Sequence, residues 1–133
     1  MKPAPDDANR AAGRPAALVA AVIATGGFSV AFLVLAVLAL RGGHGAFSGH
    51  VAVGLLVWGL VNAIAAVALG QLRWWARGLV VALGLLHLLA FGQSMLVAPW
   101  AGVGLLAALV AVVGASWPST RTVLHPWRRT VSE

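Results

Sequence analysis

The sequence contains no cysteine and almost no acidic residues. Of its 133 residues only Asp6, Asp7 and Glu133 are acidic, and all three lie close to the ends of the chain. The absence of cysteine excludes disulfides, thiolate metal sites and cysteine nucleophiles. The position of the carboxylates excludes a glycosidase pair, an HExxH metalloprotease and a carboxylate-bound metal, because each needs carboxylates at its centre. We therefore predict no enzyme activity, no metal site and no cofactor.

Charged residues of either sign are scarce as well. Only 9% of the chain is charged, whereas 61% is hydrophobic and the mean hydropathy is +0.95. A soluble domain uses about 25% charged residues to cover its surface with polar groups. This composition predicts a chain whose outer surface faces lipid.

Four long uncharged runs follow one another along the chain, over residues 16–40, 51–70, 78–98 and 101–117. A helix needs about 20 residues to cross a hydrocarbon core of about 30 Å, with about 17 to 25 tolerated. The runs are apolar throughout rather than alternating, which favours helices over a β-barrel. We predict one transmembrane domain, residues 16–117, folded as an all-α, antiparallel four-helix bundle with up-down-up-down topology and short loops.

The basic residues are distributed unevenly between the two sides of this bundle. Eight Lys or Arg residues fall on the side of the chain termini and of the 71–77 connection, whereas Arg41 alone falls on the other side. Because cytoplasmic segments are enriched in Lys and Arg, we expect a plasma-membrane protein with both termini in the cytoplasm. Residues 1–15 should form a disordered tail, and residues 118–133 a basic cytoplasmic tail.

Aromatic and basic residues gather at the ends of the runs. The sequence Arg-Trp-Trp-Ala-Arg precedes the third run, and two further tryptophans flank the fourth. Indoles at headgroup level and guanidiniums on lipid phosphates anchor helices at the interface. We interpret these side chains as interfacial anchors rather than a stacking clamp for nucleic acid: Arg73, Trp74, Trp75, Arg77, Trp100 and Trp117. The expected partner is the lipid bilayer, not nucleic acid, with a homo-oligomer or another membrane protein left open.

This layout resembles that of a group of natural proteins. Four spans, the Arg-Trp-Trp-Ala-Arg junction and the Trp-Pro-Ser-Thr-Arg stop after the fourth span are similar to small integral membrane proteins of high-GC actinobacteria. Most proteins of that group have no assigned activity, so the resemblance implies a fold and no functional residue.

Small residues recur every four positions in several of the runs. Ala17, Ala21, Thr25 and Ser29 form such a stripe in the first run, and residues 107, 111 and 115 are alanines of the fourth. Small side chains let helix backbones approach closely, which drives helix association in lipid. We predict that these stripes line contacts between the helices.

Three polar side chains are expected deep inside the membrane. Thr25, Asn62 and His87 lie eight or nine residues from the cytoplasmic ends of their runs, about 12 to 13 Å deep at 1.5 Å per residue. An unpaired amide or imidazole in lipid is costly. We predict that the three turn inward, bond to each other or to a backbone carbonyl, and form a polar clasp that fixes helix pairing, with a proton- or solute-handling site as the alternative.

The shortage of ionisable groups inside the spans bears on function. Ion-coupled transporters, pumps and intramembrane hydrolases use charges at membrane depth, and this chain has none there. We favour an accessory, scaffold or assembly subunit that acts through helix contacts. The alternative is an oligomeric channel or carrier for a small neutral or weakly polar solute. A lipid-directed enzyme with His87 as its base would lack a partner acid.

Overall fold

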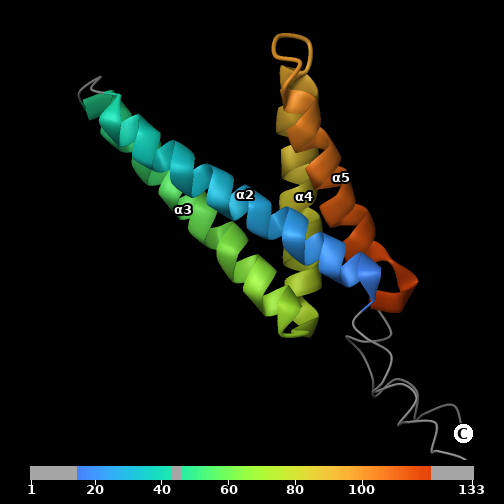
Figure 1. Ribbon diagram of the computed structural model, residues 1–133. Helices are drawn as coiled ribbons and strands as arrows, with labels where there is room; N and C mark the ends of the chain where they lie inside the picture. Colours follow the sequence, from blue (N-terminus) through green and yellow to red (C-terminus); the bar gives the residue numbers. More distant parts are fainter. Residues whose placement is uncertain (1–14, 43–45, 121–133) are drawn as a thin grey trace, which may run out of the picture.

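Four α-helices make up the computed structural model of the protein, which describes residues 15–42 and 46–120 (Figure 1). They are α2 (Ala16–Arg41), α3 (Ala46–Gly70), α4 (Trp74–Ser94) and α5 (Ala101–Ser116). Within the described ranges there is no strand. Each helix runs antiparallel to the next and all four pack together, which confirms the predicted all-α four-helix bundle.

The bundle consists of two helical hairpins that cross each other. α2 packs along α3 and α4 packs along α5, and the hairpins meet through α2–α5 and α3–α4 contacts. Figure 1 shows the hairpins close together at the end that holds the start of α2 and the α3–α4 turn, and apart at the opposite end. Of the four most extensive contacts between helices, the one between α3 and α4 is the smallest.

The outer surface of the bundle is apolar. α2, residues 48–70 of α3, and α4 are long and apolar enough to cross a membrane, and α5 is a shorter apolar helix of 16 residues. Large aliphatic side chains point outward, with Ile23 68% exposed, Leu89 64% and Val103 75%. Lipid accommodates such a surface, so the helices are compatible with those of a small polytopic membrane protein.

Two helices begin before the uncharged runs that predicted them. α3 begins at Ala46, five residues before the predicted span of 51–70, and α4 at Trp74, four residues before the span of 78–98. Hydropathy marks where charge ends, whereas helical hydrogen bonds continue through basic residues such as Arg77. α4 also ends at Ser94 rather than at residue 98, because Pro99 disfavours helical geometry in the residues before it.

The α3–α4 turn is closed by two backbone hydrogen bonds. The N–H of Leu72 donates to the carbonyl of Leu69 (3.0 Å), and the N–H of Arg73 donates to the carbonyl of Ala68 (3.0 Å). This pair of bonds is a Schellman motif, which usually places glycine at the position of Leu72. Leu72 adopts the left-handed φ of 60°, and its partly buried side chain packs against the core, which offsets the backbone strain. The turn leaves Arg73 directly before α4.

Small side chains fill most of the core. The central cluster consists of Leu18, Ala21, Ala65, Ala68, Leu69, Ala76, Val80, Leu83, Ala111 and Ala115. Three members of the predicted small-residue stripes belong to this cluster, and two more, Thr25 and Ser29, are buried as well. Among the described glycines, the closest approach to the backbone of another helix is at Gly114, where an added Cβ would lie 2.5 Å from the carbonyl oxygen of Ala17. Close backbone contact between α2 and α5 thus contributes to helix association in this bundle.

Candidate functional site

The polar residues predicted to form a clasp lie inside the bundle. His87 of α4 is 3% exposed, Thr25 of α2 is 2% exposed and Asn62 of α3 is fully buried. Their surroundings are apolar, so each polar atom requires a partner within the protein.

An aromatic cluster from three helices surrounds the imidazole of His87. The ring of Phe28 stacks on it with a centroid distance of 4.2 Å and an interplanar angle of 4°. The rings of Phe32 and Phe91 lie 5.5 and 6.1 Å away in stacked orientations, and the indole of Trp58 approaches edge-on at 6.0 Å. These are favourable geometries for aromatic pairs, so the four neighbouring rings fix the plane of the imidazole.

Hydrogen bonds engage both nitrogens of this imidazole. The Nε1–H of Trp58 donates to Nε2 of His87 at 3.1 Å and thereby links α3 to α4. Because Nε2 accepts, the ring carries its proton on Nδ1, which bonds to the backbone of Leu83 one turn earlier. Both nitrogens of the imidazole therefore have partners within the protein.

Thr25 and Asn62 form hydrogen bonds within their own helices. Oγ1 of Thr25 donates to the carbonyl of Ala21 (2.8 Å), and Nδ2 of Asn62 donates to the carbonyl of Trp58 (2.9 Å). The Oδ1 atom of Asn62 is buried without a hydrogen-bond partner. Among the described residues, no direct bond joins Thr25, Asn62 and His87 to one another. Thr25 and Asn62 bond to backbone carbonyls, and the interhelical bond of this cluster is the one between Trp58 and His87.

Trp58 is the site residue that the sequence interpretation missed. It is the only one of the six tryptophans that lies in the interior of an uncharged run rather than at its end or outside it. An indole N–H at mid-depth in lipid needs an acceptor, just as an imidazole there needs a donor. From this unusual position, the hydrogen bond between Trp58 and His87 could have been predicted.

We expect Asn62→Leu to leave the bundle as stable as the wild type or more stable. Leucine keeps the branching of asparagine, removes a buried oxygen that lacks a partner, and gives up only a bond within α3. The measurement is the thermal unfolding midpoint in a mild detergent, with Asn62→Ala as the control for the change in volume. A fall of more than about 4 °C, equivalent to about 1 kcal/mol, in Asn62→Leu would contradict the prediction.

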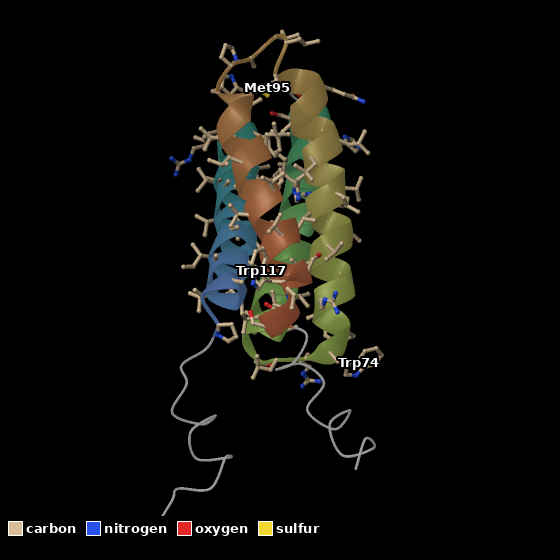
Figure 2. The ribbon with its side chains drawn as sticks, turned by 90° about the vertical axis from the view of Figure 1, so that its right-hand side faces the viewer. Trp74, Met95 and Trp117 are labelled. Atoms are coloured by element: carbon tan, nitrogen blue, oxygen red, sulfur yellow. The ribbon has the colours of Figure 1, made fainter. Side chains whose placement is uncertain are left out.

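The predicted anchors are largely exposed at the ends of the helices. The exposed fractions of the four indoles are 68% for Trp74, 40% for Trp75, 72% for Trp100 and 53% for Trp117. Figure 2 shows Trp74 at the opposite end of the bundle from Met95, which directly follows α4. Arg77 has a structural contact in addition, because its Nε donates to the carbonyl of Ala115 at 2.9 Å and ties α4 to the end of α5.

Over residues 15–42 and 46–120, no group of three or more His, Asp or Glu side chains could hold a metal ion. In comparisons with known proteins, no family model matches the chain and no curated protein or solved structure is significantly similar to it. The contacts described above therefore carry the functional proposal.

Proposed function

We propose that this membrane protein acts as an accessory, scaffold or assembly subunit through contacts of its helices. The observation that supports the proposal most is the use of the buried polar groups. Trp58 and His87 bond to each other, and Thr25 bonds to its own helix. The bonds of these groups hold the bundle together, which is what an accessory or scaffold subunit requires.

The lipid-facing surface supports the same proposal. Gly54 of α3 and Gly78 of α4 are exposed, and an added Cβ at either position would meet nothing within 4 Å. Exposed glycines allow the backbone of a neighbouring transmembrane helix to approach closely.

Photocrosslinking in intact cells tests this function. A crosslinking amino acid is placed in turn at exposed positions of the four helices, such as Ile23, Val57, Leu89 and Val103. We expect one helix face to give an adduct with a single membrane protein at positions one helical turn apart. The buried Leu83 serves as the control position. Adducts with lipid alone from all four helices would contradict the proposal.

The alternative, an oligomeric channel for a small neutral solute, is favoured by one observation. Oδ1 of Asn62 is an unpartnered acceptor in the middle of the bundle, and such an atom can bind a polar solute in passing. Glycerol or urea flux into proteoliposomes distinguishes the two functions. Flux above that of empty vesicles, abolished by Asn62→Leu, would favour the channel over the scaffold.

We propose further that both chain termini face the cytoplasm and that the membrane is the plasma membrane. The start of α2, the end of α5 and the α3–α4 turn lie at one end of the bundle (Figure 1), together with Arg73 and Arg77. The opposite end carries Arg41 at the end of α2. This asymmetry supports the orientation that the Lys and Arg count predicts.

Cysteine labelling tests this orientation. Gln71 and Gln93 are both exposed and lie at opposite ends of α4, so Gln71→Cys and Gln93→Cys form a matched pair. The chain has no cysteine of its own, so the background is zero. A membrane-impermeant maleimide should label Gln93→Cys in intact cells and Gln71→Cys only after permeabilisation. Labelling of both from the same side would overturn the proposed topology.

A further inference from the structure

A groove lies on the outer surface of the bundle beside the α3–α4 turn. Its volume is about 350 Å³, and it is lined by Ala63, Ile64, Val67, Ala68, Gln71, Arg73 and Trp75. The α3 side of the groove is entirely aliphatic, whereas Gln71 and Arg73 place an amide and a guanidinium at the turn. The groove is therefore apolar along the helix and polar at the level of the turn, as is a phospholipid beside a transmembrane helix.

The charge of Arg73 has no carboxylate to balance it in the described chain. Residues 15–42 and 46–120 contain neither Asp nor Glu, and the first turn of α4 has no acidic side chain. The guanidinium of Arg73 is exposed at the mouth of the groove. An anion from the surroundings is the complementary partner for it, and a phosphate accepts the paired N–H groups of a guanidinium.

The side chain of Arg77, by contrast, is already held by a hydrogen bond within the protein. It lies across Trp75 in a second groove with Trp74, Gly78, Val81 and Ser116. There its Nε is already engaged by the carbonyl of Ala115. The groove of Arg73 is therefore the better candidate for a ligand.

We propose that the groove at Arg73 binds one anionic phospholipid per chain. The phosphate lies on the guanidinium of Arg73 and the amide of Gln71, an acyl chain follows Ile64 and Val67, and the indole of Trp75 closes one side at headgroup level. This is a stoichiometric site with a headgroup preference, which general interfacial anchoring does not provide. It is independent of the proposed function, since a scaffold and a channel could both carry it.

Native mass spectrometry of the full chain tests the headgroup preference. The protein is released from vesicles that contain equal amounts of phosphatidylglycerol and phosphatidylcholine with identical acyl chains. We expect one phosphatidylglycerol to be retained in about fivefold preference, the factor that corresponds to about 1 kcal/mol for one arginine. Arg73→Gln should abolish the preference and Arg73→Lys should keep most of it. Arg41→Gln, a matched change at the opposite end of the bundle, should leave it unchanged.

A second pair of variants tests the groove itself. Ala63 is a partly buried lining residue, so Ala63→Phe should fill the groove and reduce retention of both lipids. Ala31→Phe adds the same ring to an exposed position of α2 and should have no effect. Equal retention of the two lipids by the wild type, equal losses in Arg73→Gln and Arg41→Gln, or unchanged retention in Ala63→Phe would each overturn the proposal. Circular dichroism of every variant verifies that the helices are intact.

Discussion

Replacing Gly114 with alanine is expected to lower the free energy of unfolding by about 1 to 3 kcal/mol. The new Cβ would lie 2.5 Å from the carbonyl oxygen of Ala17, 3.1 Å from Cβ of Ala21 and 3.3 Å from its backbone nitrogen. All three atoms belong to the backbone or the first side-chain atom of α2, so no rotation of a side chain can relieve the contact. α2 and α5 would have to move apart.

Gly54→Ala is the matched control for this substitution. It makes the same change within a helix, but its Cβ would meet nothing within 4 Å. Alanine has a higher helix propensity than glycine, so Gly54→Ala should be neutral or stabilising. The midpoint of unfolding in mixed micelles with increasing SDS measures both variants. Equal shifts in the two midpoints would show that the α2–α5 contact is not as tight as described.

Breaking the Trp58–His87 bond is expected to have the second large effect. Trp58→Phe keeps an aromatic ring but removes the N–H that donates to Nε2 of His87, which leaves a buried acceptor without a partner. His87→Leu removes the acceptor and the stacking on Phe28 as well. Interhelical hydrogen bonds in membranes are worth about 0.6 to 2 kcal/mol. We expect the free energy of unfolding to fall by about that amount in Trp58→Phe and by somewhat more in His87→Leu.

A double-mutant cycle isolates the bond from the change in packing. The variant that carries both substitutions should be more stable than the sum of the single losses implies, because the second change no longer breaks a bond. Trp100→Phe, which alters an indole that is 72% exposed, is the control and should leave the unfolding midpoint unchanged. Additive losses would mean that the bond contributes nothing to stability.

His87→Leu also separates a structural role from a functional one. If His87 only holds α3 against α4, the variant should retain the crosslinked adduct despite its lower stability. Loss of the adduct with an unchanged unfolding midpoint would assign His87 a role in the function itself.

The number and type of the helices could be predicted from the sequence because lipid imposes a simple rule. Each span must be apolar and must satisfy its backbone internally, so an uncharged run of sufficient length is a helix. The limits of α3 and α4 could not be read in this way. Hydropathy does not register the helical turn that contains Trp74 and Arg77, or the effect of Pro99 on the end of α4.

The depth of the candidate site along the helices could be predicted from the sequence, but its hydrogen-bond partners could not. Counting residues along the spans placed Asn62 and His87 at similar depths, and both are buried. Partner choice depends on the rotation of each helix about its axis and on the reach of each side chain. The long indole of Trp58, one turn from Asn62, reaches His87, whereas the shorter amide of Asn62 bonds to a carbonyl of its own helix.

The contact at Gly114 was beyond prediction for a different reason. The chain contains 16 glycines and many alanines, so several small-residue stripes fit the pattern equally well. Which of them faces another backbone is decided by how the hairpins cross, and that angle is not encoded in any single helix.

The unequal lengths of the two hairpins couple the shape of the bundle to the thickness of the bilayer. With 26 and 25 residues, α2 and α3 are about 38 to 39 Å long, whereas the 16 residues of α5 span about 24 Å. A hydrocarbon core of about 30 Å therefore accommodates the longer pair only when it is inclined, at a cost of fractions of a kcal/mol per Å of mismatch. We therefore expect α2 and α3 to incline further in a thinner bilayer and to stand more upright in a thicker one. We expect a change in membrane thickness to alter the angle between the two hairpins and to load the α3–α4 contact, which is the smallest of the four and which the Trp58–His87 bond spans.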